Sequence, residues 1–239
     1  MTSQKYRMTY SKVFPAIYLA HLDSMNSLIR AIRRSGLPYL VTQGFHPRIK
    51  CSYGPALPLG FHGKSEFFDF YLSDDMPEDE VSSALSKQFP IGFSLEKVRK
   101  FTSEAFPDGN DFKVIIRIYC NSSSAEVNRM ILSFFTDPNL KIDLPPGSTP
   151  EYFVPSESVS CFSVSDNSVV SITANENENE KSISALENPS LSKYNQVIYT
   201  FRPINSAGKS ISPSKTVNAL AAYLGDGKFS ITKIERELV

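Results

Sequence analysis

Residues 65–100 read SEFFDFYLSDDMPEDEVSSALSKQFPIGFSLEKVRK. The segment 65–72 alternates in a way that is typical of a strand with one buried face. Pro77 and the three acids after it favour the start of a helix, because proline and negative charge are both preferred in a first helical turn. The segment 91–101 then returns as a strand. This stretch therefore predicts a strand, a loop, a helix, a short turn and a strand.

The residues before this stretch supply the rest of one domain. Residues 5–13 predict a strand, and residues 21–36 predict a helix that stops at Gly36. The apolar side of this helix is predicted to hold Leu22, Met25, Ile29 and Ile32. Extended segments follow at about 38–43 and 48–57. The order over residues 5–101 is thus β-α-β-β-α-β, which is the ferredoxin-like arrangement.

The second half of the chain repeats this order imperfectly. The segment 197–237 again runs strand, loop, helix, turn and strand, as residues 65–100 do. The expected elements are strands at 112–120, 196–204 and 229–239, two or three strands across 150–174, and helices at 124–137 and 212–225, capped by Ser124 and Ser212.

The sequence therefore predicts an α+β protein made of tandem ferredoxin-like halves with antiparallel sheets. The first domain is expected at 1–105 and the second at 106–239, with a hinge at 106–111 and an acidic, low-complexity loop at 175–182.

Composition narrows the class of protein. No apolar run approaches the ~20 residues that cross a bilayer, and the first residues lack the apolar core of a signal peptide. We therefore expect a cytoplasmic protein. Its three cysteines, Cys51, Cys120 and Cys161, are too far apart for a C-x-x-C metal knuckle or a disulfide framework.

Positive charge is concentrated at one end of the chain. Residues 1–64 hold nine Lys or Arg and one acid, Asp23, whereas the remaining residues carry 16 bases and 24 acids. The formal net charge of 0 hides this asymmetry. A basic face predicts a partner that carries phosphates. The alternative is that the bases are dispersed and paired with acids from the second half.

Two groups of residues could form an RNA-binding surface. Arg30, Arg33 and Arg34 share one stripe of the predicted helix, with no acid three or four residues away to neutralise them. The segment 42–60 adds the bases Arg48 and Lys50, and the groove or stacking candidates Gln43, Phe45, His46 and Tyr53. Cations on phosphates and aromatic rings on bases are the usual means of binding single-stranded RNA.

The histidines allow other interpretations. His21 or His46 could act as a general base in RNA cleavage, since neighbouring guanidiniums would stabilise the transition state. His21, His46 and His62, with Asp23 and Cys51, could also bind a metal ion, but no pair has the spacing of a recognisable metal site. His21 could instead be a helix-entry residue paired with Asp23, and we favour this interpretation. We expect no cofactor, no metal and no complete catalytic constellation.

Four motifs carry a resemblance to a known family. These are His21-Leu22-Asp23, the run from Arg30 to Pro38 (RAIRRSGLP), the run from Gln43 to Pro47 (QGFHP), and the run from Pro55 to Gly60 (PALPLG). In these motifs the chain resembles the bacterial radical SAM-linked protein family, whose domain has no known function. The match is specific over residues 8–100 and looser beyond.

The resemblance implies a partner. Members of that family are fused to radical SAM enzymes or encoded beside them, often near genes for ribosomal proteins and an RNase, which implies translation or RNA modification. This chain lacks C-x-x-x-C-x-x-C, so it does not hold the radical SAM cluster itself. We expect a non-catalytic RNA-binding or substrate-presenting partner of a radical SAM enzyme. The alternatives are an RNA endonuclease or modifying enzyme that uses His21 or His46, and a protein-interaction scaffold.

Overall fold

The computed structural model describes residues 3–101, 112–120, 124–143, 152–155, 162–167, 195–201, 212–225 and 229–238. It is an α+β protein in which most neighbouring strands are antiparallel. The chain divides into two compact units. Unit 1 comprises Met1–Phe112 together with Glu235–Val239, and unit 2 comprises Lys113–Ile234. The expected hinge at 106–111 and the acidic loop at 175–182 lie outside the described residues.

Unit 1 has the β-α-β-β-α-β order predicted for residues 5–101. Its elements are β1 (Gln4–Lys12), a 3-10 turn η1 (Ala16–Tyr18), α1 (His21–Arg34), β2 (Cys51–Tyr53), β3 (His62–Leu72), α2 (Glu78–Ser86) and β4 (Phe93–Lys100). The strands lie in the order β4-β1-β3-β2, and all these neighbours are antiparallel. The end of β10 (Phe229–Leu238) adds to this sheet, because Glu235 and Arg236 pair in parallel with His62 and Gly63 of β3.

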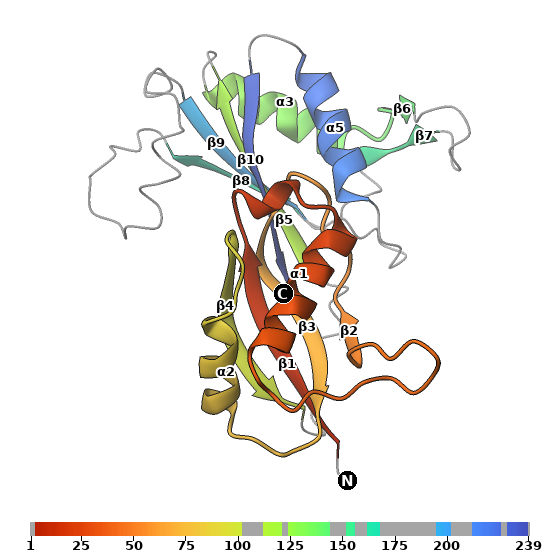
Figure 1. The fold of residues 1–239 in the computed structure, drawn as a ribbon. Coiled ribbons are helices and arrows are strands. Elements are labelled where there is room, and N and C mark those ends of the chain that lie inside the picture. The colour runs from red at the N-terminus through yellow and green to blue at the C-terminus, as the bar shows by residue number, and fades with distance from the viewer. Residues whose placement is uncertain are drawn as a thin grey trace. The chain divides into compact units, whose positions relative to one another are not determined.

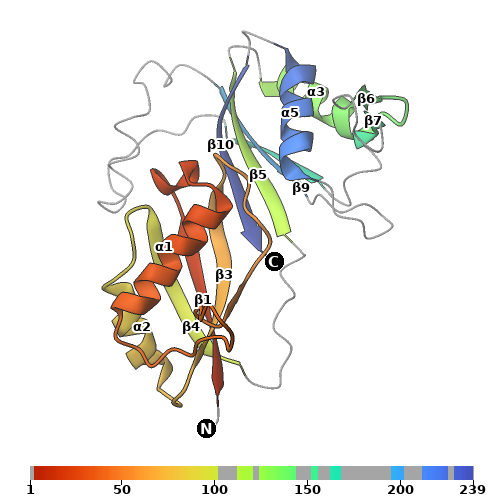
Figure 2. The same cartoon turned by 45° about the vertical axis from the view of Figure 1, so that its right-hand side comes forward.

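The core of unit 1 lies between the sheet and its two helices. Figures 1 and 2 show α1 and α2 on the same face of the sheet. Alternate residues of β1 and β3 point into this core, as the strand period requires. The buried set includes Tyr6, Met8 and Tyr10 of β1, Phe68, Phe70 and Leu72 of β3, Met25, Leu28 and Ile32 of α1, and Val81 and Leu85 of α2. The expected burial of Phe68, Phe70 and Leu72 is confirmed.

One residue of α1 departs from the predicted apolar side. Leu22 is 71% exposed, whereas Leu28 is fully buried beside Met25 and Ile32. A helix turns by roughly 100° per residue, so Leu22 lies roughly 120° from Leu28 around the axis. The prediction for Leu22 was therefore wrong. It lies on the side of the helix that carries the arginines. The predicted stop is confirmed, since Gly36 follows the last turn with a φ of 74°.

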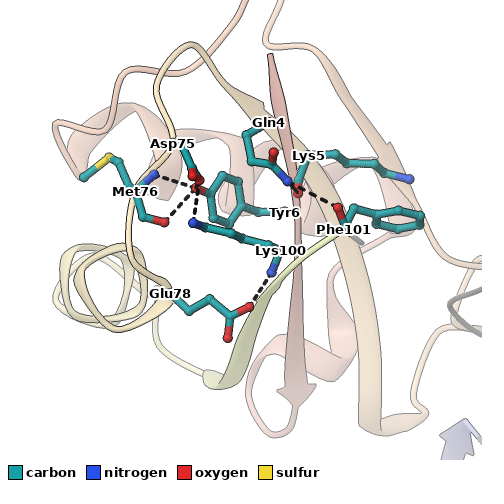
Figure 3. Close-up of polar contacts among 8 residues, drawn as sticks. All are labelled: Gln4, Lys5, Tyr6, Asp75, Met76, Glu78, Lys100 and Phe101. Carbon is teal, nitrogen blue, oxygen red and sulfur yellow. Dashed lines mark hydrogen bonds and ion pairs between the residues drawn. The ribbon is translucent and has the colours of Figure 1, made fainter. Parts of the chain in front are cut away.

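A polar network joins β1, α2 and β4 at one end of unit 1 (Figure 3). The buried Tyr6 hydroxyl accepts a bond from the Met76 amide and donates one to the Met76 carbonyl, both at 2.8 Å. Lys100 pairs with Asp75, and its amide donates to the Glu78 carboxylate at 2.7 Å. These contacts fix the loop that leads into α2. They satisfy the buried hydroxyl, and they give this cluster a structural role.

Unit 2 is described through the elements that follow β4. They are the rest of β5 (Phe112–Cys120), α3 (Ser124–Thr136), β6 (Ile142–Asp143), β7 (Tyr152–Phe153), β8 (Phe162–Asn167), β9 (Asn195–Phe201), α5 (Pro213–Leu224) and the first part of β10. The strands lie in the order β10-β5-β9-β8, and β6 pairs separately with β7. Val114, Ile116 and Ile118 are fully buried, as predicted. Helices α3 and α5 contact each other, with the Phe134 and Tyr223 ring centroids 5.2 Å apart.

Candidate functional site: a basic surface and a charged pocket

The predicted phosphate-binding residues are exposed, in two groups. Arg30, Arg33 and Arg34 lie on the outer side of α1, and Arg34 donates to the Gln88 carbonyl at 2.8 Å, just beyond α2. Arg48 and Lys50 lie in the connection between α1 and β2. The Lys50 ammonium lies 4.3 Å from the centroid of the Tyr71 ring on β3. We call the three arginines of α1 the helix group, and Arg48 with Lys50 the hairpin group. Arg34 of the helix group contacts Gln88, and Lys50 of the hairpin group contacts Tyr71.

The bases of residues 1–64 fall into two sets, with and without acidic partners. Lys5 and Arg7 both pair with the buried carboxylate of Asp69, at 2.9 and 2.7 Å. Lys64 lies 3.8 Å from Glu235. In the described part of the chain, by contrast, no carboxylate lies within 4.0 Å of the five predicted phosphate-binding residues. The predicted phosphate-binding bases therefore belong to the set without acidic partners. Of the three ion pairs named above, only the one between Lys64 and Glu235 uses an acid from the second half of the chain.

The segment from Gly44 to Gly60 contains both exposed and packed residues. Residues 39–42 run beside 48–50, since the Thr42 amide donates to the Arg48 carbonyl at 2.7 Å and the Lys50 amide to the Leu40 carbonyl at 2.8 Å. This hairpin projects away from the sheet (Figure 1). At its tip Gln43, Phe45 and His46 are exposed, and Phe45 is completely exposed to solvent.

Tyr53 is placed differently from the other predicted stacking residues. It is 44% exposed, and its ring centroid lies 5.9 Å from that of His21 and 5.5 Å from that of Phe68. The structure therefore brings Tyr53 together with His21 at the start of α1. Phe45 and His46 lie elsewhere, at the hairpin tip.

A small pocket opens beside Tyr53 and His21. Its volume is about 10 Å³, close to what one water molecule needs. Its wall is formed by Tyr10, Lys12, His21, Ser24, Met25, Tyr53, Gly54, Pro55, Leu57, Glu66 and Phe67. All of these residues belong to unit 1. Two of the four motifs of the sequence, the one at His21 and the one that begins at Pro55, meet at this pocket.

The wall of the pocket rests on a buried ion pair. Arg236 of β10 is 1% exposed, and its Nε donates to Glu66 Oε1 at 2.9 Å while its Nη2 donates to Glu66 Oε2. Its Nη1 and Nη2 also donate to the carbonyls of Ala56 and Pro55, at 2.9 and 2.7 Å. Gly63 leaves room for this arrangement, because a Cβ there would lie 2.5 Å from the Glu66 side chain. Arg236 thus fixes both Glu66 and the wall at Pro55.

Three polar side chains of the pocket, those of Lys12, His21 and Ser24, take no part in this ion pair. Lys12 is 2% exposed, and its ammonium donates to the Leu19 carbonyl at 2.9 Å. Burial lowers the pKa of Lys12, while Glu66 opposes this shift and Arg236 adds to it. Burial also lowers the pKa of His21, and the charges of Lys12 and Arg236 lower it further, so its imidazole is neutral at pH 7. The hydroxyl of Ser24 is buried without a hydrogen-bond partner.

These residues suggest what the pocket can do chemically. Lys12 and the hydroxyl of Ser24 can donate hydrogen bonds, and a neutral imidazole at His21 can accept a proton. Neither Lys12, Ser24, Glu66 nor Arg236 was predicted as a site residue. From sequence alone a lysine on a strand is expected to be solvated, and 170 residues separate Glu66 from Arg236. The excess of bases before residue 64 was the only signal for Lys12.

The metal interpretation finds no support in the described residues. No group of three or more His, Cys, Asp or Glu that could hold a metal ion occurs among them. His62 is buried beside β10, His46 is exposed at the hairpin tip and His21 lines the pocket. Burial raises the pKa of the Cys51 thiol, which makes it a poor thiolate ligand.

The comparison with protein families identifies the chain. Residues 5–140 match the family described as an uncharacterized protein conserved in bacteria (DUF2344). The chain belongs to this family. The match covers unit 1 up to β5 and extends through α3, and the family's description names no activity, ligand or radical SAM enzyme. No curated protein matches the chain. In the portion that the structure describes, every helix is too short or too polar to cross a membrane.

Proposed function

We propose that the protein binds RNA through the exposed bases of α1 and of the hairpin before β2, without catalysing a reaction on it. The observation that carries this proposal is that Arg30, Arg33, Arg48 and Lys50 are exposed, and that carboxylates neutralise other bases of the same segment instead. Exposed arginines without acidic partners retain their donors for phosphate oxygens, which a guanidinium can bind in a bidentate manner.

The hairpin tip adds a second element of RNA recognition. Phe45 is fully exposed beside His46, so both rings are accessible to unstacked bases. Stacking on an aromatic ring is worth about 1–3 kcal/mol per base. A nucleobase stacked on the ring would cover the exposed face of Phe45. The helix group and the hairpin group would then contact successive parts of one strand.

Substituting the exposed bases should weaken RNA binding in a salt-dependent manner. Removing one phosphate-binding side chain should reduce the slope of log affinity against log salt by roughly 0.7 for a single strand. Titrations of labelled RNA at several salt concentrations would compare Arg30→Ala, Arg33→Ala and Lys50→Ala with the parent protein. Lys97→Ala is the matched control, because Lys97 is an exposed base on β4, at the opposite edge of the sheet from β2.

The same titrations separate this proposal from its two alternatives. Unchanged affinity and slope in all three variants would contradict RNA binding and favour a surface that docks an acidic protein. Cleaved RNA that disappears with His21→Ala or His46→Ala would favour an enzyme. His21 is the better candidate of the two, since its neutral imidazole lies at a pocket and His46 lies at an exposed tip.

We also propose a tandem ferredoxin-like fold in a cytoplasmic protein, with a radical SAM enzyme as the partner. The fold proposal is supported by the matching strand orders, β4-β1-β3-β2 and β10-β5-β9-β8. The partner proposal rests on the resemblance alone. A pull-down from the native cell with nucleic acid retained should recover both RNA and a radical SAM enzyme. Recovery of RNA with other proteins, and no radical SAM enzyme, would contradict the partner while leaving RNA binding intact.

A further inference from the structure

We propose that the pocket lined by Lys12, His21 and Ser24 binds a terminal phosphate group, one oxygen of which enters the pocket. The ligand is a phosphate monoester, carried either by a free nucleotide or by the end of an RNA strand. This site is separate from the exposed basic surface, and the inference does not depend on RNA binding there.

The first support is the state of Lys12. Its side chain is almost completely buried, yet the described acceptor of its ammonium is one carbonyl oxygen, that of Leu19. No carboxylate in the described residues lies within 4.0 Å of the Lys12 ammonium. The carboxylate of the nearby Glu66 is bound by Arg236 through both of its oxygens. A buried charge without a counter-ion is costly. An anion in the pocket would supply the missing counter-ion.

The second support is independent of charge. Ser24 is 2% exposed and lines the same pocket, and its Oγ has no hydrogen-bond partner. A buried hydroxyl normally finds one, so the unpartnered hydroxyl in this pocket wall can donate to a ligand atom that enters the pocket. Because a hydroxyl can rotate its proton toward an acceptor, Ser24 can donate to the same oxygen as Lys12.

The charges around the pocket select an anion. Lys12 and Arg236 are positive, Glu66 is negative with both oxygens bound by Arg236, and His21 is neutral, which leaves an excess of one positive charge. His21 and Ser24 also belong to the first turn of α1, where the helix dipole is positive. A cation or a neutral sugar would leave Lys12 unpaired.

The size of the pocket limits how the ligand sits. About 10 Å³ accommodates one oxygen atom and not a whole phosphate, so the remainder of the group must stay at the mouth. Tyr53 is the exposed residue of the pocket wall, and its ring centroid lies 5.9 Å from that of His21. A nucleoside attached to the phosphate would therefore meet an aromatic side chain immediately outside.

The test measures binding of three probes to the full chain. The probes are inorganic phosphate, a nucleoside monophosphate, and a 5′-phosphorylated oligonucleotide compared with the same strand lacking its phosphate. We expect phosphate and at least one phosphate monoester to raise the melting temperature, and to shift the His21 ring signals in NMR. The nucleotide and the phosphorylated strand distinguish the two sources of the group.

Two variants examine the pocket itself. Ser24→Ala should weaken binding about tenfold, because it removes one hydrogen bond to a charged group. Ser27→Ala is its matched control, since Ser27 lies on the same helix and its hydroxyl donates to the Asp23 carbonyl at 2.8 Å. Lys12→Met should abolish binding while leaving the melting temperature of the ligand-free protein unchanged or higher, since a buried unpaired charge is replaced by an apolar chain.

Three results would overturn the proposal. One is that none of the probes binds at millimolar concentration. Another is that binding persists undiminished in folded Ser24→Ala and Lys12→Met proteins. The third is that Arg30→Ala removes binding of the nucleoside monophosphate as effectively as Lys12→Met does, which would assign the phosphate to the exposed basic surface. Loss of RNA binding in Arg30→Ala, with monophosphate binding intact, would instead support two separate sites.

Discussion

Replacing Arg236 with methionine is expected to lower the free energy of unfolding by about 3–5 kcal/mol. The substitution leaves the Glu66 carboxylate buried at 3% exposure without the guanidinium that binds both of its oxygens. It also removes the donors to the carbonyls of Ala56 and Pro55. Urea denaturation followed by circular dichroism would measure the change.

A second substitution separates the charge from the packing. In the double variant Glu66→Met with Arg236→Met, much of the stability should return, because two apolar side chains can replace a buried ion pair at little cost. Arg99→Met is the matched control, since Arg99 is exposed on β4, and its effect should stay within about 0.5 kcal/mol. A loss of less than about 1 kcal/mol in Arg236→Met would show that Glu66 reaches water.

Replacing Phe70 with alanine should cost a similar amount, about 3–5 kcal/mol. Phe70 is fully buried on β3, and its ring stacks on that of Tyr6 with centroids 5.8 Å apart. The substitution removes this stacking and leaves a cavity between the sheet and the helices of unit 1. The same denaturation experiment measures the effect.

Phe45→Ala provides the comparison for this core substitution. It makes the same chemical change at a fully exposed position, so it should alter stability by less than about 0.5 kcal/mol. It should nevertheless weaken RNA binding if Phe45 stacks on a base. Equal losses of stability in Phe45→Ala and Phe70→Ala would contradict the placement of either residue.

Regular periodicity made much of unit 1 predictable from the sequence. The alternation at Phe68, Phe70 and Leu72 identified the buried face of β3, because a strand that covers a core repeats every two residues. The same reasoning located Val114, Ile116 and Ile118 in β5. Gly36 correctly marked the end of α1, since its positive φ suits glycine.

The pocket could not be predicted in this way. Its ion pair joins residues that are 170 positions apart, and local patterns carry no information about such contacts. Lys12 lies at the end of a strand whose alternation places it on the core side, where a lysine is rarely found. The prediction for Leu22 failed for a related reason. The apolar residues of α1 can be read as a stripe that includes Leu22 or as one that includes Leu28. Only the packing of the helix against the sheet decides which of the two stripes is buried.

The membership of Glu235–Val239 in unit 1 affects how the chain is made. During translation the first 112 residues leave the ribosome well before Arg236 does, and the whole of unit 2 is synthesised in between. Throughout that interval the Glu66 carboxylate lacks its guanidinium, and the Pro55 and Ala56 carbonyls lack their donor. The core of the first unit is encoded before residue 99, whereas the contacts of Arg236 at the charged pocket can form only after the whole of unit 2 has been synthesised.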